Sequence, residues 1–327
     1  MILAGDIGGT KTHLALCRRS DSGLDRFADK IYRTRDYPSL VTVCTEFLKG
    51  AKSPDALCFG VPGPVIGGRS HATNVAWAME QPALSAAFAG RPVCLMNDLE
   101  ATAYGVLHLA ENETIVLQAG EHHPDANCAV IAAGTGLGEA ALIAQDGRYR
   151  ALASEGGHAD FAPRGVDQIN LMKFLAAEFG HASYERALSG PGLTNIYQFL
   201  KASTPVSEPS WLSDELNSAH DPAAVISQAA LANRDARCVQ ALEMMVAIYG
   251  AEAANLALKV LALGGVYLGG GIAPKILPML QRGGFVSAFN DKGRLGGMLR
   301  TIPIRVVLNQ DAGLIGAAYS ALAMLGE

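Results

Sequence analysis

Three glycine-rich segments contain residue types suited to binding phosphate groups. They are Gly5-Asp6-Ile7-Gly8-Gly9-Thr10, Gly134-Thr135-Gly136-Leu137-Gly138 and Gly269-Gly270-Gly271. Glycine lets main-chain N–H groups approach phosphate oxygens closely, and the hydroxyl of Thr10 adds a further donor. Because glycine loses more backbone entropy on folding than other residues, the joint presence of three loops favours one nucleotide bound by several of them over three unrelated turns.

The first segment differs from two well-known phosphate-binding motifs. A P-loop requires glycine and lysine where this chain has Thr10 and Lys11, and it must open a helix, whereas the residues after Lys11 have a strand pattern. No Gly-x-Gly-x-x-Gly lies between a strand and a helix, which disfavours a dinucleotide fold. We therefore expect a phosphate-binding hairpin turn in which Asp6 orients Mg²⁺ through water. An ordinary glycine hairpin capped by its aspartate explains this loop alone equally well.

A candidate catalytic carboxylate, Asp98, follows a short apolar strand and Asn97, and it precedes a helix. An aspartate at such a position is commonly a helix N-cap, a role that does not exclude catalysis. Phosphoryl transfer requires a carboxylate within hydrogen-bond reach of the attacking hydroxyl, while Mg²⁺ and main-chain donors stabilise the phosphoryl group. The accompanying glycine loops favour a catalytic aspartate over one that only caps the helix.

The segment Glu155-Gly156-Gly157-His158 has the Glu-x-x-His spacing of carboxylate-bridged metal sites. Those sites place both side chains on one face of a helix, and the two glycines make that helix improbable. A loop that presents a carboxylate and an imidazole suits a polyol, whose hydroxyls need both donors and acceptors. The alternative is that these residues are structural or solvated, and it is strongest for Glu185, which lies in a plain helical stretch.

Six segments together resemble the bacterial glucokinase family, in the family's order and across nearly the whole chain. The resemblance implies the actin-like ATPase (ribonuclease H-like) fold, an α/β fold of two lobes with a central cleft. It also implies ATP with Mg²⁺, glucose 6-phosphate as product, and a homodimer. The segments are Gly5 to Thr10, Asn97-Asp98, Gly134 to Gly138, Glu155 to His158, Leu188-Ser189-Gly190-Pro191-Gly192-Leu193 and Gly269-Gly270-Gly271-Ile272.

The same resemblance implies a role for each candidate site residue. Asp98 takes the proton from a sugar hydroxyl that attacks the γ-phosphate, and Asn97 holds a neighbouring hydroxyl. Asn74 falls where the family has a sugar-side loop, although a turn asparagine beside a core tryptophan is an equally good interpretation. Further glucose hydroxyls are assigned to Glu155, His158 and Glu185. The nucleotide is assigned to Gly5, Asp6, Ile7, Gly8, Gly9, Thr10, Gly134, Thr135, Gly269, Gly270 and Gly271.

Two strand–glycine turn–strand segments, residues 2–16 and 129–143, position these groups and indicate a weak internal duplication. One opens each half of the chain, which suggests two α/β lobes facing each other across a cleft; coincidence between common glycine hairpins is the alternative. At 327 residues the chain exceeds the usual size of one hydrophobic core. We predict a smaller lobe of residues 1–108 plus 303–327 and a larger lobe of residues 109–302.

Composition excludes several other classes. The net charge of −5 and the absence of a basic run disfavour nucleic-acid binding. The N-terminus lacks the pattern of a signal peptide, so we expect a cytoplasmic protein, and the most apolar stretch falls short of the ~20 residues of a membrane span. The six cysteines form no Cys-x-x-Cys pair. A related branch of sugar kinases has a cysteine-rich zinc motif shortly after its glycine-histidine segment. This chain has no cysteine between Cys128 and Cys238, so we predict no zinc and assign the chain to the zinc-free glucokinase group.

Two other functions compete with a glucose kinase. A kinase for another hexose, such as mannose or an amino sugar, differs only in the placement of a few hydroxyl partners. The residues Lys11-Thr12-His13 resemble the other branch of sugar kinases and leave this alternative open. A sugar-binding regulator on the same fold carries a DNA-binding helical domain before its first hairpin. That reading is disfavoured, since the first strand here begins at residue 2.

Overall fold

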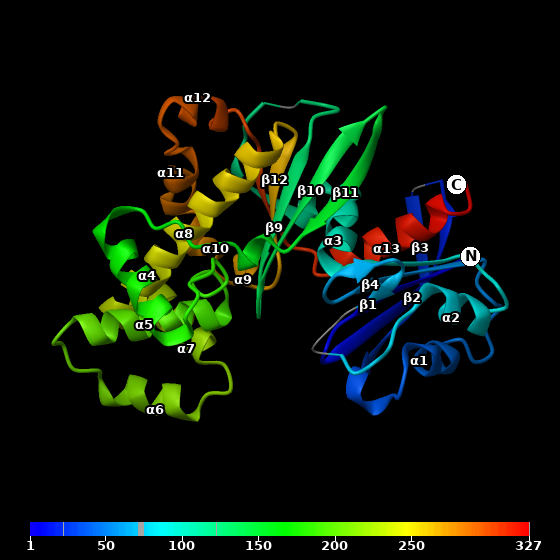
Figure 1. The fold of residues 1–327 in the computed structure, drawn as a ribbon, viewed down its shortest axis with the longest axis horizontal. Coiled ribbons are helices and arrows are strands. Elements are labelled where there is room, and N and C mark those ends of the chain that lie inside the picture. Colours follow the sequence, from blue (N-terminus) through cyan, green and yellow to red (C-terminus); the bar gives the residue numbers. More distant parts are fainter. Residues whose placement is uncertain (22, 71–74, 122, 327) are drawn as a thin grey trace. The chain divides into compact units, whose positions relative to one another are not determined.

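The computed structural model of the chain describes every residue except 22, 71–74, 122 and 327. The chain packs into two compact units, which are considered separately (Figure 1). The predicted lobes, residues 1–108 plus 303–327 and residues 109–302, stay a prediction. The first unit comprises Met1–Glu113, Tyr149–Ala153 and Asn309–Glu327, and the second comprises Thr114–Arg148 and Ser154–Leu308.

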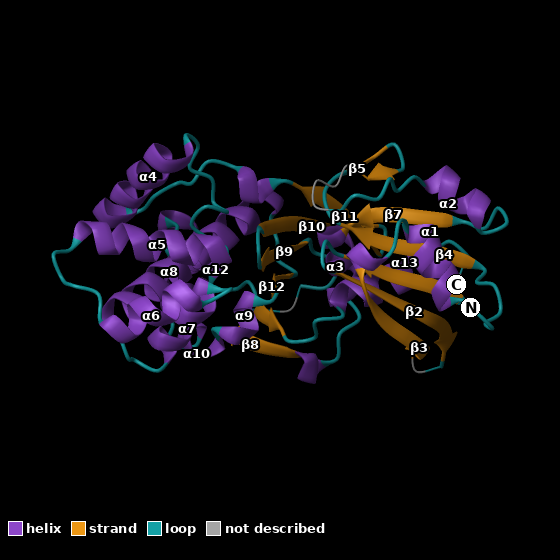
Figure 2. Ribbon diagram, turned by 90° about the horizontal axis from the view of Figure 1, so that it is seen from below, coloured by secondary structure: helices purple, strands orange, loops and turns teal. Residues whose placement is uncertain are grey.

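The first unit is built on a five-stranded sheet in the order β3-β2-β1-β4-β7, drawn in orange in Figure 2. β1 (Ile2–Ile7) is antiparallel to β2 (Lys11–Ser20), which is antiparallel to β3 (Gly23–Arg33). β1 is also parallel to β4 (Ala56–Val61), which is parallel to β7 (Val93–Asn97). β1 and β4 are apolar along almost their whole length because both faces of these central strands are covered.

Helices cover both faces of this first sheet. α1 (Leu40–Phe47) and α2 (Gln81–Ala87) pack with one set of buried strand residues, and α3 (Asp98–Val106) and α13 (Ala312–Ala323) pack with the other set. The remaining short elements of the first unit are η1 (Thr34–Asp36), β5 (Val65–Ile66), β6 (Arg69–Ser70) and η2 (Glu111–Glu113).

α3 and α13 approach each other closely because each has a glycine where they meet. A Cβ atom on Gly105 would lie 1.8 Å from the carbonyl oxygen of Ala312, and one on Gly316 would lie 1.8 Å from that of Ala101. Neither position has room for a side chain. The contact places the start of α13 at the edge of the sheet where β1 ends.

The second unit has a sheet in the order β11-β10-β9-β12-β13-β8. β9 is antiparallel to β10 and parallel to β12, which is parallel to β13. The first five positions repeat the strand order of the first sheet, and the directions of β10, β9, β12 and β13 match those of β2, β1, β4 and β7. The duplication predicted from the two glycine hairpins is therefore confirmed at the level of strand order. The strands are β8 (Thr114–Gln118), β9 (Cys128–Ala133), β10 (Leu137–Gln145), β11 (Arg148–Ser154), β12 (Gly265–Gly269) and β13 (Ile304–Val307).

The central helix of the second unit is α8 (Ala236–Val260), against which α5 (Gly190–Ser203), α7 (Pro222–Leu231) and α11 (Gly284–Asn290) pack. By length and composition α8 could cross a membrane, but 72% of its most apolar window is buried inside the protein. Its apolarity therefore has an explanation in core packing. The other helices are η3 (Gly156–His158), α4 (Gly165–Phe179), α6 (Ser210–Ser218), α9 (Ile272–Lys275), α10 (Leu277–Leu280), η4 (Gly293–Leu295) and α12 (Gly296–Leu299).

Candidate active site

The parallel strands of the first unit bring Asp6 and Asp98 to the same edge of their sheet. Asp6 on β1 pairs with Gly60 on β4, and Asn97 ends the neighbouring strand β7. Gly60 lies between the two aspartates, because a Cβ atom there would be 3.8 Å from the Cα atom of Asp98. The carboxyl ends of parallel strands are the usual place for ligand sites in α/β sheets. Gly60 was not predicted as a site residue, because its role depends on this close approach between distant segments.

Asn97, and not Asp98, caps α3. The Asn97 Oδ1 atom accepts a hydrogen bond from the main-chain N–H of Leu99 at 2.9 Å, and its Nδ2 atom donates to the carbonyl of Gly63 at 3.0 Å. Asp98 is the first residue of the helix, and its Oδ1 atom also accepts from Leu99 N–H, at 2.8 Å. The capping role that was the alternative for Asp98 thus belongs to Asn97. The positive end of the helix dipole stabilises an ionised carboxylate at this position, as a general base requires.

Asp6 belongs to a group of charged side chains at the start of α13. A Cβ atom on Gly313 would lie 3.7 Å from Asp6 Cγ. His13 contacts Asp29 at 2.8 Å and Asp311 at 3.5 Å. Burial raises the pKa of Asp6, while His13 lowers it and Asp311 raises it further. The Asp6 carboxyl is thus enclosed by groups of both signs and is an oxygen donor suited to the water shell of Mg²⁺.

Two threonines hold the first glycine turn in place. The Gly8 N–H donates to the Lys11 carbonyl at 2.8 Å, which closes the turn. The Thr34 hydroxyl donates to the Gly8 carbonyl at 2.7 Å and lies 3.0 Å from the hydroxyl of Thr12. The Thr34 N–H also donates to the Thr10 carbonyl at 3.1 Å. These bonds fix the turn from its buried side, while its tip at residues 9–10 is exposed.

The glycine loops of the second unit lie next to one another, although they are far apart in the sequence. The Gly190 N–H at the start of α5 donates to the Gly134 carbonyl at 2.8 Å. Gly270 has a φ of +77°, and a Cβ atom there would lie 2.4 Å from the carbonyl oxygen of Ala133. The beginning of α5, capped by Ser189, adds a helix N-terminus, which favours anions. In the sequence Gly190 is part of a segment that resembles the glucokinase family, and it was not predicted as a site residue. The Ser-Gly-Pro-Gly sequence at the start of α5 is the signal that could have identified it.

The structure brings Glu155, His158 and Glu185 together in the second unit. The His158 Nδ1 atom lies 3.7 Å from Glu155 Oε2, and its Nε2 atom lies 3.8 Å from Glu185 Oε1. The side chains of Glu155 and His158 are more than half exposed, at 58% and 62%, while that of Glu185 is 29% exposed. Two carboxylates and one imidazole thus offer hydrogen-bond acceptors and a donor to the same small volume, as a polyol requires.

Glu185 lies in an irregular segment between α4 and α5, so the prediction that it lies in a helical stretch is wrong. Its main-chain N–H donates to the Gly157 carbonyl at 2.9 Å, and the preceding N–H of Tyr184 donates to the Ala159 carbonyl at 3.0 Å. These non-local bonds replace helical ones. The Glu185 Oε2 atom also accepts from the Leu137 N–H at 2.9 Å, which links it to the glycine hairpin between β9 and β10.

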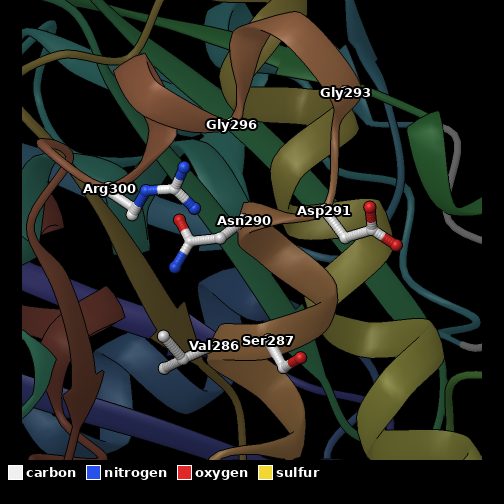
Figure 3. A pocket seen from close by; sticks show the side chains of 7 residues that line it. All are labelled: Val286, Ser287, Asn290, Asp291, Gly293, Gly296 and Arg300. Atoms are coloured by element: carbon white, nitrogen blue, oxygen red, sulfur yellow. The ribbon is translucent and has the colours of Figure 1, made fainter.

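Asn74, the remaining predicted sugar-side residue, lies outside the described residues. A hollow of about 420 Å³ elsewhere in the second unit contains none of the predicted site residues. In Figure 3 the side chains of Asn290 and Arg300 point toward each other across it. The hollow is lined by Val286, Ser287, Asn290, Asp291, Gly293, Gly296 and Arg300.

Comparison with known proteins identifies the family of the chain. A family model described as Glucokinase matches residues 3–324. The glucokinase of a Synechocystis species is 42% identical over 344 residues, covering 98% of this chain and 97% of its own. The chain belongs to the glucokinase family. The glucokinase of a Nostoc species is 40% identical over 337 residues and covers 98% of each chain.

A solved glucokinase structure extends this family likeness to the fold. The glucokinase from an Antarctic psychrotroph superposes with a TM-score of 0.87 at 30% identity, covering 98% of both chains. The predicted fold class, the α/β actin-like ATPase fold shared by glucokinases, is confirmed. The two glycine hairpins in the sequence predicted one part of this fold, the repeated strand order of the two sheets.

Proposed function

We propose that this glucokinase family member transfers the γ-phosphate of ATP to glucose, giving glucose 6-phosphate and ADP. The observation that carries the proposal is the position of Glu185. One of its carboxylate oxygens binds the N–H of Leu137 at the end of a glycine hairpin, and the other lies beside His158. A polyol-binding cluster is therefore connected to a phosphate-binding turn, and a sugar kinase needs both kinds of group at one reaction centre.

Asp98 is proposed as the general base of this reaction. The sugar oxygen forms a bond to the γ-phosphorus, the bond from that phosphorus to the bridging oxygen of the β-phosphate breaks, and the hydroxyl proton passes to Asp98. Main-chain donors of the glycine loops stabilise the charge on the phosphoryl group, which is the main catalytic requirement of such transfers. Asp98 lies in the first turn of α3, where the positive end of the helix dipole favours the negative charge that a general base carries.

Mg²⁺ enters the site with ATP as part of the substrate, and it neutralises charge on the phosphates when it is bound. Asp6 is the residue proposed to hold a water of its shell. The nucleotide itself is assigned to the loops at residues 5–10, 134–135 and 269–271. We predict no zinc, because the chain lacks the cysteine-rich segment of the zinc-containing branch.

The sugar is assigned to Glu155, His158, Glu185 and Asn97, with Asn74 as a further candidate. The two glutamates accept hydrogen bonds from hydroxyls, while the imidazole can donate or accept. The Asn97 amide already bonds Leu99 and Gly63, so its second N–H and the remaining lone pair of its oxygen are what a sugar could use. The names of the matched relatives favour glucose over mannose or an amino sugar.

The family resemblance also supports three wider proposals. We expect a cytoplasmic enzyme that begins glycolysis by trapping glucose as its phosphate, and we expect a homodimer. Light scattering of the purified chain tests the dimer directly, and a mass equal to one chain at assay concentration would contradict it.

The experiment that tests the function measures ADP release in a coupled assay with glucose, mannose and an amino sugar. Wild type is expected to release ADP with glucose, and Asp98→Asn is expected to lower kcat by about 10²–10⁴-fold, the usual contribution of a positioned general base. Glu100→Gln, two residues further along α3, is the matched control and should keep near-wild-type turnover. No sugar-dependent ADP release would reject the kinase, and near-normal turnover of Asp98→Asn would reject the base.

A further inference from the structure

Two glutamates of the second unit are buried against each other beneath the 155–158 loop. Glu139 on β10 is 2% exposed, and Glu252 in the middle of α8 is 0% exposed. Their side chains are in hydrogen-bond contact, yet the Oε1 atom of each finds no donor among the described residues. Two carboxylates in contact cannot both ionise at low cost, and a buried acceptor without a donor is destabilising. One proton between the two carboxyl groups would remove both difficulties.

The surroundings indicate which glutamate carries that proton. Glu252 Oε2 accepts from Asn255 Nδ2 at 2.7 Å, and Glu252 Oε1 lies 3.7 Å from Lys259 Nζ. Glu252 therefore has a hydrogen-bond donor and a positive charge beside it. Glu139 has no comparable partner, and burial together with the charge of Glu252 raises its pKa to about 8, against a smaller opposing effect of Lys259. Glu139 is therefore the acid of the pair at neutral pH.

The Glu139 carboxyl directly supports the 155–158 loop. A Cβ atom on Gly156 would lie 2.2 Å from Glu139 Oε2, so the loop main chain rests on this carboxyl. Ser154 ties the same two residues together, because its hydroxyl donates to the Glu139 carbonyl at 2.9 Å and accepts from the Gly156 N–H at 3.2 Å. A displacement of the Glu139 side chain would move Gly156 and, with it, Glu155 and His158.

Glu252 connects the pair to the second segment of the site. Tyr184, the residue before Glu185, contacts Glu252 through its hydroxyl and accepts from Asn255 Nδ2 at 2.9 Å. Burial, followed by the charge of Glu252, raises the pKa of the Tyr184 hydroxyl, which therefore stays protonated and donates. Lys292 completes the network, donating to Asn255 Oδ1. Both segments that present Glu155, His158 and Glu185 are thus attached to one buried acid pair.

We propose that Glu139 and Glu252 share one proton and that this acid pair positions the two segments bearing Glu155, His158 and Glu185. Neither glutamate touches the substrates in this account, so both are positioning residues. The existence of the pair rests on the geometry alone, whereas its effect on glucose rests on the proposed function. Loss of the proton would leave two adjacent negative charges beneath Gly156 and would disturb the site.

The charged and titratable groups that face the pair come from four elements. They are Lys259 on α8, Lys292 after α11, Tyr184 in the segment before α5, and Glu155 and His158 on the loop above. The two lysines favour one negative charge on the pair. Lys259 lies 3.7 Å from Glu252, and it lowers the pKa of Glu139 by less than burial and the charge of Glu252 raise it. The groups around the pair therefore favour the state in which the two glutamates share one proton.

Infrared spectroscopy of the folded chain without substrates tests the shared proton. Wild type at pH 7 should show the carbonyl band of a buried, protonated carboxylic acid, and Glu139→Gln should lack it. Glu243→Gln, an exposed glutamate on the same helix α8, is the matched control and should keep the band. Absence of the band from wild type, or its persistence in Glu139→Gln, would overturn the pair whatever the chain's activity.

The pH dependence of glucose binding tests the positioning role. In wild type the KM for glucose should rise severalfold once the pH passes about 8, while kcat changes less. Glu139→Gln donates a hydrogen bond without titrating, so its KM should stay level over the same range. An equal rise in the variant would overturn the role. If Glu139→Gln fails to fold, Glu252→Gln replaces it. This variant removes the charge that raises the pKa of Glu139, so the rise in KM should move to a lower pH, and a rise at the wild-type pH would overturn the role. If no sugar supports ADP release, the proposed function fails while the infrared result still decides the pair.

Discussion

The two glycine hairpins have equivalent places in their sheets but different supports. Each joins its strands with three residues, 8–10 in the first unit and 134–136 in the second. The first is fixed by the hydroxyl of Thr34, which binds the Gly8 carbonyl. The second is fixed by the N–H of Gly190 and by Glu185, which binds the end of the turn. The first turn is thus held by a neighbour that serves only the turn, whereas the second is held by groups that also belong to the proposed sugar site.

The same contrast appears at the third residue of the following strand. His13 occupies this place in β2 and contacts two carboxylates, those of Asp29 and Asp311, in a partly exposed setting. Glu139 occupies it in β10 and is buried against Glu252. An imidazole and a carboxylate can bond to each other directly, while two buried carboxyl groups in contact need a proton between them. One topological position therefore supports a histidine–carboxylate contact in one unit and a titrating pair in the other.

The largest effect should come from removing the titrating pair. The pKa of Glu139 is about 8 in the folded protein against an ordinary value of 4.5. Between these values the native state holds a proton that the unfolded chain has released. The stabilisation that this proton gives the native state is therefore fully present below pH 4.5. As the pH rises from 4.5 to about 8, the unfolding free energy falls by up to about 1.4 kcal/mol per pH unit.

Urea unfolding across this pH window measures that slope. Glu139→Gln should flatten the slope relative to wild type, since glutamine does not titrate. Glu243→Gln should leave the slope unchanged because its carboxylate is exposed. A slope of wild-type size in Glu139→Gln would mean that other groups cause the pH dependence, and the contrast with His13 would lose its basis.

Removing the support of the first hairpin should have the next largest effect. Thr34→Val deletes the hydroxyl that donates to Gly8 and leaves a partly buried carbonyl without this donor, which should cost about 1–3 kcal/mol of unfolding free energy. Thr45→Val removes an exposed hydroxyl bonded within α1 and is the control. Urea unfolding distinguishes the two. Equal, small losses in both variants would show that the hairpin does not depend on Thr34.

Removing a support of the second hairpin should cost less stability. Ser189→Ala deletes the cap of α5 and should lower the unfolding free energy by about 1 kcal/mol. Because Gly190 binds the Gly134 carbonyl, the KM for ATP should rise as well. Asp221→Ala removes the cap of α7 instead, so it should lower stability similarly without raising that KM. An unchanged KM for ATP in Ser189→Ala would separate α5 from the nucleotide site.

The smallest stability effect should come from Gly134→Ala. A Cβ atom there meets nothing within 4 Å, and the residue does not have the positive φ that favours glycine. Unfolding free energy should change by less than about 0.5 kcal/mol. The KM for ATP should nevertheless rise if main-chain atoms of this turn approach phosphate oxygens. A variant that is normal in both stability and KM would contradict the assignment of this loop to the nucleotide.

The local parts of the fold and site could be predicted from the sequence. Strand alternation and glycine turns identify the two hairpins, and the motif order identifies the family. Interactions between distant segments could not be predicted, because no local pattern records them. Glu185 looks helical in sequence but is held by Gly157 and Leu137, and Asn97 takes the capping role because its amide also reaches Gly63. In the sequence Glu139 is a single polar residue in a strand, and only the folded structure shows its contact with Glu252 on α8.

The most direct test of the central claim identifies the product. Purified chain is incubated with glucose and ATP, and phosphorus NMR follows the phosphates. The account predicts that glucose 6-phosphate and ADP appear in equal amounts and that both depend on glucose. ADP without a sugar phosphate, or a phosphate on a different glucose hydroxyl, would contradict it.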